Sequence, residues 1–228
     1  MPEIAKIRRA LPLRDQVLDG VIRGLTSGTF RPGERLTEAG VATALGVSRT
    51  PVREALGLLA QRGTLTRRAQ GGFVVAAPSL KILQEVLEVR RLLEPSAARR
   101  AAKRVTAAEI SDMRRALQRL RKVAAKGSEQ EIVRAIWEFR QLVYGSSGND
   151  ALTKAIEQAN DYYDVQFIIL LALAGSAVRK LMVACQVQIL AALEARNGAA
   201  VERAVHKNLD AWYRSSADAL SRLEPASA

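Results

Sequence analysis

Two arginines four residues apart are the clearest candidates for chemistry in the sequence. Arg49 and Arg53 lie in the stretch GVSRTPVREAL, residues 46–56. At about 100° per residue they share one side of a helix, whereas Val52 and Leu59 lie on another. A guanidinium can bind guanine O6 and N7 bidentately or clamp a phosphate. The spacing therefore predicts a helix with a packed side and a DNA-contacting side; the alternative is a solvated pair, with Arg53 joined to a carboxylate.

Pro51 indicates where this helix begins. Proline is tolerated in the first turn, because the backbone N–H groups there have no partner within the helix. We expect Ser48 or Thr50 to cap that end. The free N–H groups and the helix dipole also suit a phosphate.

Catalytic candidates are few, because the chain has one cysteine and one histidine. Cys185 lies in the apolar stretch LMVACQVQIL, which predicts a buried, inert thiol rather than a nucleophile. With no second cysteine, an intramolecular disulfide is excluded, as suits a reducing cytoplasm. Neither Cys185 nor His206 falls in a recognisable nucleophile or metal motif, so we expect no enzyme activity.

The charge balance points to a polyanionic partner. The 228 residues carry a formal net charge of +12, from 35 basic and 23 acidic side chains, which suits nucleic acid or an anionic membrane surface. The most apolar stretch, residues 165–178, is shorter than the roughly 20 residues of a membrane span. It predicts a buried core helix and no membrane contact. No signal peptide is visible, so a cytoplasmic location is expected.

Short helices and turns alternate over residues 1–76. Val17 and Leu25 belong to a helical pattern that Gly28 should end, and a Pro-Gly turn follows in RPGERL. A second helical pattern starts at Leu36, and the arginine-bearing helix comes third. LTRRAQGGFVVA then predicts a β-hairpin with a two-glycine turn. The order predicts a winged helix-turn-helix domain whose wing is a small hairpin.

Residues 77–228 are helical in pattern throughout. Pro95 should kink or interrupt the first helix, and TAAE (106–109) and SEQE (128–131) are capping-box starts of two more. Two further helices are expected over about 151–195 and a last one over about 199–223. The predicted fold is therefore mostly α, with the winged helix-turn-helix followed by an all-α helical bundle.

Residues 13–75 closely resemble the DNA-binding domain of GntR-type transcriptional regulators. PGERLTE, LGVSRTPVREAL and GGFV occur in the family's order and spacing. The resemblance implies that a small set of residues contacts the operator: Ser48, Arg49, Thr50 and Arg53 on the recognition helix, Arg35 before the second helix, and Gly72 at the wing tip. Some relatives carry a basic DNA contact where this chain has Ala39, so its sequence preference should differ.

Residues 77–228 resemble, more loosely, the FadR-like branch with its FCD effector domain, in EVRRLLEPSAARRAA, FRQLVYGSSGNDAL and VERAVHKNLD. Many members bind a divalent metal there through one aspartate and three histidines. The corresponding positions here are Ile136, Arg140, Gln186 and Asn208, which are poor zinc ligands. We therefore expect no metal and no other cofactor. His206 lies two residues from the Asn208 position and should be a surface or cap residue.

The same positions suggest an effector site. Arg140 could bind a carboxylate bidentately, with help from Arg90 and hydrogen bonds from Gln186 and Asn208. An organic acid or a more apolar molecule could be the effector. The alternative is that these polar groups satisfy one another and bind no small acid.

Together, the residues and the resemblance imply a sequence-specific transcriptional regulator, usually a repressor in this family, whose operator binding a small-molecule effector modulates. The resemblance also implies a homodimer, and two recognition helices call for a palindromic double-stranded operator. The alternative is a nucleoid-like DNA-binding protein of low specificity without an effector, which the net charge would equally support.

Overall fold

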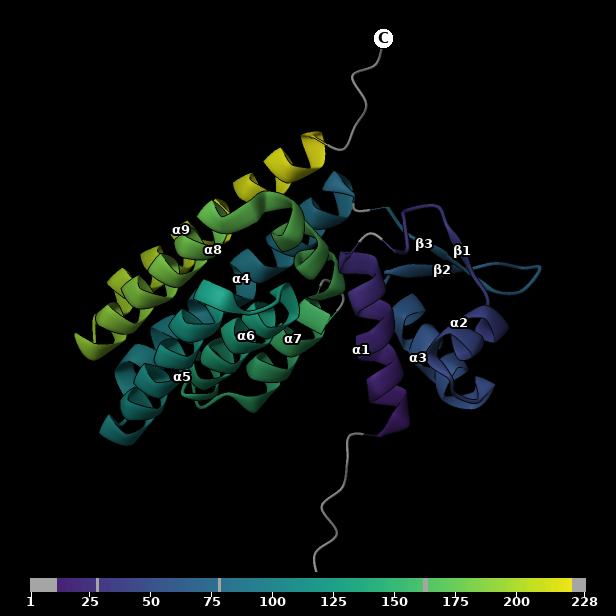
Figure 1. Ribbon diagram of the computed structural model, residues 1–228. Coiled ribbons are helices and arrows are strands. Elements are labelled where there is room, and N and C mark those ends of the chain that lie inside the picture. Colours follow the sequence, from purple (N-terminus) through teal and green to yellow (C-terminus); the bar gives the residue numbers. More distant parts are fainter. Residues whose placement is uncertain (1–11, 28, 78, 162–163, 223–228) are drawn as a thin grey trace, which may run out of the picture. The chain divides into compact units, whose positions relative to one another are not determined.

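The computed structural model describes residues 12–27, 29–77, 79–161 and 164–222 (Figure 1). The chain divides into two compact units, Met1–Ala77 and Pro78–Ala228. The first unit runs in the order α1 (Leu13–Thr26), β1 (Arg35–Leu36), α2 (Glu38–Leu45), α3 (Arg49–Gln61), β2 (Leu65–Arg67) and β3 (Phe73–Val75). The second unit is helical, and the predicted fold class is confirmed.

The core of the first unit forms where α1 and α2 pack on α3. Val21 of α1 and Val52, Leu56 and Leu59 of α3 have no exposed surface. These positions follow the helical spacing of the apolar residues in the sequence. The packed side of the arginine-bearing helix is therefore the predicted one.

The wing has one more strand than the sequence predicted. β3 lies between β1 and β2 and pairs antiparallel with both, so that Val74 faces Arg35 on one side and Thr66 on the other. The expected two-stranded hairpin thus forms two strands of a three-stranded sheet, with β3 at its centre. β1 was not predicted, because a two-residue strand is too short to show an alternating pattern of apolar and polar residues.

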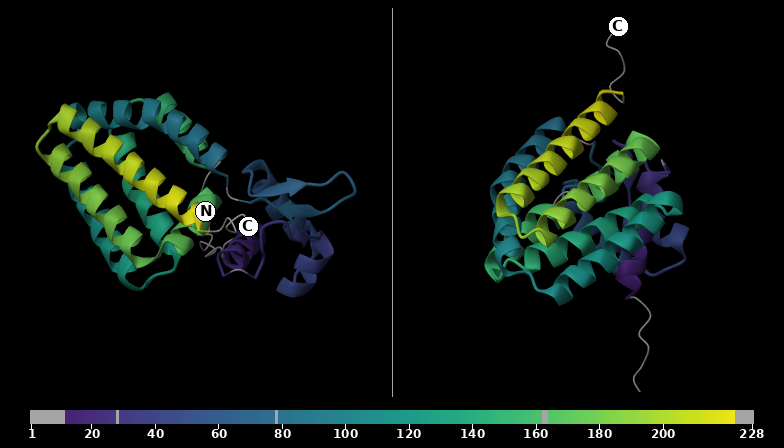
Figure 2. Two further views of the ribbon diagram at one scale, coloured as in Figure 1. Left: turned by 90° about the horizontal axis from the view of Figure 1, so that it is seen from above. Right: turned by 90° about the vertical axis from the view of Figure 1, so that its left-hand side faces the viewer.

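The second unit consists of long helices packed around a shared core (Figures 1 and 2). Its elements are α4 (Leu80–Arg104), α5 (Ala107–Lys126), α6 (Glu129–Gly145), α7 (Asp150–Asp161), α8 (Asp164–Glu194) and α9 (Gly198–Ser221). α9 packs along both α4 and α8, and α5 packs on α6 and α8. Both predicted capping boxes form, with Thr106 and Glu109 at α5 and Ser128 and Glu131 at α6.

Two features of these helices differ from the expectation. α4 continues through Pro95 without interruption, and the proline is buried. Burial of a whole helix face, including Leu83, Leu87 and Ala98, offsets the loss of one backbone donor. α8 contains a break at Gly175, where φ is 76° and ψ is −169°.

The apolar stretch of α8 packs inside the second unit only in its first half. Phe167, Ile168, Leu170 and Leu171 are buried, as expected of a core helix, whereas Ser176 and Ala177 beyond the break are exposed. By length and composition Ala174–Glu194 could cross a membrane, with a mean hydropathy of 1.3, but a single helix of this kind is weak support for a span.

Candidate DNA-binding surface and buried polar cluster

The start of α3 presents a polar, exposed surface. Ser48, Arg49, Thr50 and Arg53 are all exposed, while Val52 between them is fully buried. Within the described part of the chain neither guanidinium forms an ion pair, so the alternative of an Arg53–carboxylate pair finds no support there. The helix can thus offer both guanidiniums to a polyanion.

The cap of α3 differs from the expectation. Ser48 occupies the N-cap position, but its side chain accepts no hydrogen bond from the first turn, and Thr50 already lies within the helix. Pro51 is the third helical residue, in the first turn as predicted. The Ser48 hydroxyl and the neighbouring N–H groups are therefore not engaged in a side-chain cap and remain suited to a phosphate.

Arg35 and Gly72 meet where β1 passes the tip of the wing. Arg35 Nη2 donates to the carbonyl oxygen of Gly71 at 3.3 Å. Gly72 has a φ of 81°, and a Cβ there would lie 3.0 Å from the Leu36 carbonyl oxygen, so this position requires glycine. The wing also carries Arg67, whose guanidinium lies over the Phe73 ring at 5.0 Å and which sequence reasoning did not single out.

Position 39 lies on the exposed side of α2, where Ala39 presents only a methyl group. No basic side chain is therefore present at this position. Exposed arginines lie on α3, β1 and the wing, and also on α1 and in the turn before β1.

Four residues predicted to bind an effector come from four different helices and are all buried. Arg90 of α4 is 3% exposed and Arg140 of α6 is 1% exposed, while Gln186 of α8 and Asn208 of α9 have no exposed surface. Gln186 Nε2 donates to Asn208 Oδ1 at 3.4 Å, which makes these two an amide pair. No hydrogen bond among the described residues joins this pair to Arg140.

The two arginines belong to a cluster that also contains Glu94 and Tyr144. Glu94 accepts hydrogen bonds from Arg90 Nε and from the Tyr144 hydroxyl, both at 2.6 Å. The guanidiniums of Arg90 and Arg140 lie over the Trp137 ring, at 5.6 Å and 4.9 Å from its centroid. We call these five residues the arginine cluster.

Sequence reasoning missed Glu94 and Tyr144, although a signal was present. Glu94 follows Arg90 by four residues, and Tyr144 follows Arg140 by four. At that spacing each pair shares a helix face, so a carboxylate and a phenol accompany the two guanidiniums.

The arginine cluster carries an excess of positive charge. Burial opposes ionisation of Glu94, but the charges of Arg90 and Arg140 and two hydrogen bonds outweigh it, so the pKa of this carboxyl lies below its ordinary value. Burial, with Glu94 beside it, raises the pKa of Tyr144 well above its ordinary value, which keeps the phenol neutral. Burial and Arg90 lower the pKa of Arg140, but a guanidinium starts high enough to stay charged. Two cations therefore face one anion.

Arg140 has unused hydrogen-bonding capacity. Its Nε, Nη1 and Nη2 atoms are buried and have no hydrogen-bond partner within the part of the chain that is described. The same holds for Gln186 Oε1 and Asn208 Nδ2. The alternative, that these polar groups satisfy one another, holds only for the amides, which share one hydrogen bond; the Arg140 guanidinium has none within the described residues.

The metal implied by the resemblance does not fit these residues. Ile136 is fully buried and offers no donor, while Arg140 offers only N–H groups and a positive charge. Among the described residues, no three His, Cys, Asp or Glu side chains approach closely enough to hold a metal ion. The N–H donors and the positive charge of Arg140 suit an anion rather than a metal ion.

Cys185 and His206, the two other candidates for chemistry, do not belong to this set of donors. Cys185 is buried, and burial raises the pKa of its thiol, so it stays protonated and unreactive. His206 is partly exposed on α9.

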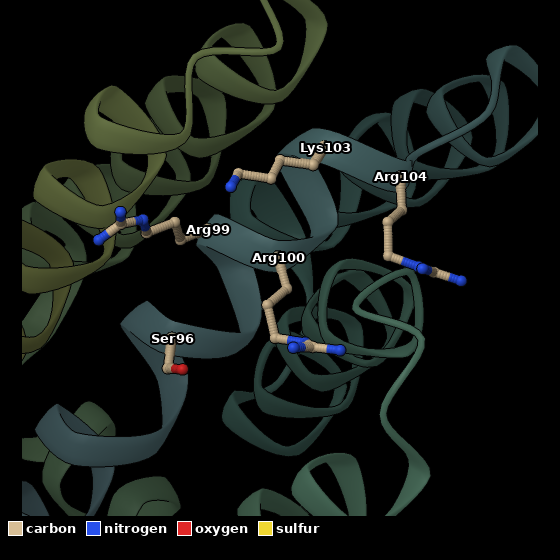
Figure 3. Close-up of a pocket in the computed structure, with 5 residues that line it drawn as sticks. All are labelled: Ser96, Arg99, Arg100, Lys103 and Arg104. Atoms are coloured by element: carbon tan, nitrogen blue, oxygen red, sulfur yellow. The ribbon is translucent and has the colours of Figure 1, made fainter.

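A basic pocket on α4 was not predicted from the sequence. Figure 3 shows that four cations and a serine from successive turns line it: Ser96, Arg99, Arg100, Lys103 and Arg104. They occur at the spacing of one helix face, the signal that could have revealed them.

Comparison with known proteins identifies both units. Residues 13–75 match the family model described as bacterial regulatory proteins, gntR family, and residues 85–211 match the FCD domain. The chain is 31% identical over 157 residues to an uncharacterized HTH-type transcriptional regulator, YdhC of Bacillus subtilis, covering 68% of this chain and 70% of that protein. It is 30% identical over 158 residues to the HTH-type transcriptional regulator McbR of Escherichia coli, covering 69% and 71%.

The solved structure of McbR/YncC from E. coli matches with a TM-score of 0.72 at 25% identity, over 94% of this chain and 100% of that one. These relatives are transcriptional regulators, and no catalytic family is indicated. The chain belongs to the gntR family of bacterial regulatory proteins, in the branch that carries an FCD domain.

Proposed function

We propose that this regulator is a repressor that acts in the cytoplasm as a homodimer on a palindromic double-stranded operator. The exposed Arg49 and Arg53 on α3 support sequence reading, because guanidiniums at the start of a recognition helix can contact base edges. The other proposed contacts are Ser48, Thr50, Arg35 and Gly72. One such helix reads only a few base pairs, so two copies are needed for an operator of useful length.

In this proposal a small organic acid is the effector, and the unpartnered guanidinium of Arg140 carries the argument. A buried charge without hydrogen bonds is costly, and a carboxylate would relieve that cost with a bidentate pair. An apolar effector would leave the guanidinium buried and without a hydrogen-bond acceptor. Arg90 adds positive charge, and the free atoms of Gln186 and Asn208 can bind further polar groups of the ligand.

Effector binding can alter DNA binding only if the acid prefers one arrangement of the dimer over another. The arginine cluster and the amide pair draw residues from α4, α6, α8 and α9. A ligand bound by all four helices would therefore favour one packing of the bundle. The spacing of the two recognition helices would follow that packing.

Selection of genomic fragments by the purified protein tests the DNA-binding part, at about 0.15 M salt. We expect a few sites that share an inverted repeat. Arg49→Ala and Arg53→Ala should lose these sites, whereas Arg121→Ala, which removes the same charge from α5, should retain them. Broad recovery of all sequences, lost steeply with salt, would instead favour a nucleoid-like protein.

Titration of the operator complex with a panel of small carboxylic acids tests the effector part. We expect at least one acid to change operator affinity in the native protein and to have no effect on Arg140→Met. Arg119→Met, which removes an exposed arginine from α5, serves as the matched control and should respond like the native protein. An equal response in Arg140→Met would remove this residue from the effector site.

A further inference from the structure

The basic pocket on α4 is a hollow surrounded by positive charge (Figure 3). Its volume is about 590 Å³, within the range of about 300–1,000 Å³ that is typical of small-molecule sites. Four of the five residues that line it are cations, and none is acidic. Most small-molecule sites are lined by apolar side chains, so the lining of this one indicates a ligand that is itself strongly anionic.

The helix dipole explains only part of this charge. Lys103 and Arg104 lie in the last turn of α4, where cations stabilise the negative end of the dipole. That effect is confined to the last turn, whereas Arg99 and Arg100 precede it. All four side chains are exposed, so packing in the core does not require them either. The concentration of cations therefore has no structural role of its own in the folded chain.

Ion pairs compensate little of the charge in the pocket. Arg99 Nη1 lies 3.5 Å from Glu202 Oε2 on α9, which is a long contact for an ion pair. Arg100, Lys103 and Arg104 form no ion pair within the described ranges of the chain. Three of the four cations are therefore available to an anion from outside the chain.

Two further charges lie beside the end of α4 and have opposite signs. Arg196 Nη2 donates to the carbonyl oxygen of Val105 at 2.7 Å. Hydrogen bonds from Thr106 chiefly, and the charge of Arg104 in part, hold the pKa of the Glu109 carboxyl below its ordinary value. Together these two residues leave the net charge around the pocket unchanged.

Two glycines allow the arginines at the edges of the pocket to pack against the backbone. A Cβ on Gly148 would lie 2.5 Å from Arg104 Nε, and a Cβ on Gly198 would lie 3.3 Å from Arg99 Cγ. Arg104 thus packs against the loop between α6 and α7, and Arg99 packs against the start of α9. A side chain that is already held in place loses less conformational entropy when it binds a ligand.

We propose that the basic pocket binds a small molecule through a diphosphate or triphosphate group. Arg99 and Arg104 are about 8 Å apart along the helix axis, so one carboxylate or one phosphate would meet only some of the four cations. A chain of phosphate groups carries several negative charges over a similar length, and arginine binds phosphate oxygens bidentately. The pocket is separate from the arginine cluster, because Arg90 and Glu94 lie on the buried side of α4.

A hollow of this kind suits a free polyphosphate better than it suits the DNA backbone. The phosphates of a duplex lie on the outside of a stiff rod, whereas those of a small molecule can enter a pocket. The phosphorus atoms of a triphosphate are also closer together than successive phosphates of a DNA strand, and so match a dense cluster of cations. DNA phosphates are the alternative that the experiment distinguishes.

Isothermal titration calorimetry of the full-length protein with inorganic triphosphate tests the pocket, at about 0.15 M salt. We expect saturable binding of one triphosphate per chain, and at least about tenfold weaker binding of orthophosphate. Arg100→Gln with Lys103→Gln removes two exposed cations and should weaken triphosphate binding at least about tenfold. A native protein that binds no triphosphate saturably would overturn the proposal.

A second variant and a matched control test the position of the site. Ser96→Glu places a carboxylate in the pocket without removing a cation and should also weaken triphosphate binding. Arg121→Gln with Lys122→Gln removes two exposed cations about 20 Å from the start of α5 and should bind triphosphate like the native protein. All these side chains are exposed, so circular dichroism should show native helix content. An equal loss in the control would mean that only net charge matters and would overturn the pocket.

Further outcomes separate this site from the proposed effector site and from DNA binding. Arg140→Met should bind triphosphate like the native protein. A loss in this variant would place the ion in the arginine cluster and overturn the pocket, while the effector proposal would stand. If Arg100→Gln with Lys103→Gln binds triphosphate normally but loses affinity for unrelated duplex DNA, these cations contact DNA phosphates and the proposal fails.

Discussion

At the scale of single residues, Arg140 costs folding stability but is suited to bind an anionic ligand. Its guanidinium is desolvated, and three nitrogen atoms have no acceptor in the described structure. Replacing such a side chain by an apolar one of similar volume can stabilise a protein, because the unsatisfied donors and their desolvation cost are removed. The residue is better explained by what it can bind than by what it contributes to folding.

We therefore predict that Arg140→Met raises the free energy of unfolding by about 1–3 kcal/mol in the absence of ligand, because it removes buried N–H donors that have no acceptor in the described structure. The variant leaves Arg90 and Glu94 as a neutral pair and fills a similar volume. Urea denaturation of both proteins in a buffer free of small acids measures the difference. A loss of stability would mean that the contacts of the guanidinium with Trp137 and Glu94 outweigh its desolvation cost, and the anion site would lose its support.

Glu94 should behave in the opposite way. Glu94→Gln leaves two buried guanidiniums without a carboxylate and should lower the free energy of unfolding by about 3–5 kcal/mol at pH 7. The folded-state pKa of Glu94 lies below its ordinary value of 4.5, so its contribution is complete above that value and is lost as the pH falls through the folded pKa.

Urea denaturation of Glu94→Gln and of the native protein at a series of pH values checks this dependence. The gap between the two should be constant from pH 7 to about 5 and should narrow only below 4.5. A gap that already closes near neutral pH would contradict a depressed pKa for this carboxyl.

At the scale of elements, the break in α8 depends on one glycine. Gly175 has a φ of 76° and a ψ of −169°, a region open almost only to glycine, although a Cβ would meet no atom within 4 Å. Gly175→Ala should therefore destabilise the protein by about 1–3 kcal/mol through backbone strain alone. Gly145→Ala at the end of α6 is the control, since it too has space but has no positive φ.

Sequence predicted the helices better than their irregularities. Thr106 and Ser128 marked two helix starts because a capping box is a local interaction with a local signature. The passage of α4 through Pro95 depends on burial against other helices, which no local pattern records. β1 forms only because β3 lies beside it.

The buried site likewise contains residues that the sequence indicated and one that it did not. The sequence suggested Arg90 and Arg140 as contacts of an effector, and both side chains are buried. It did not single out Glu94, which was visible only as one more charge on a helix rich in charges. Whether two guanidiniums meet one carboxylate or two depends on the tertiary packing of α4 against α6.

At the scale of the whole molecule, a net charge of +12 implies that every affinity for DNA depends strongly on salt. Residues 1–76 carry 12 of the 35 basic and 6 of the 23 acidic side chains, so half of the net charge lies in a third of the chain. Phosphate contacts should supply most of the binding to unrelated DNA, and base contacts should supply the preference for the operator.

The salt dependence can assign the role of Arg53. If it clamps a phosphate, Arg53→Ala should weaken binding to operator and unrelated DNA alike and reduce the slope of log affinity against log salt by about 1. If it reads a base, the loss should be about 1–3 kcal/mol on the operator alone. We expect the second result, and titrations between 50 and 200 mM salt with both DNAs distinguish the two.

The three-stranded sheet has a consequence for the operator itself. β1 pairs with β3 of the wing and is followed at once by Thr37, the N-cap of α2, which packs on α3. The wing and the recognition helix are thus held together within one unit. The spacing between the DNA segments that they would contact is therefore fixed. If the proposed dimer binds two half-sites, the width of each half-site is set by the fold, and only the gap between them can vary from one promoter to another. One base pair inserted within a half-site should abolish recognition.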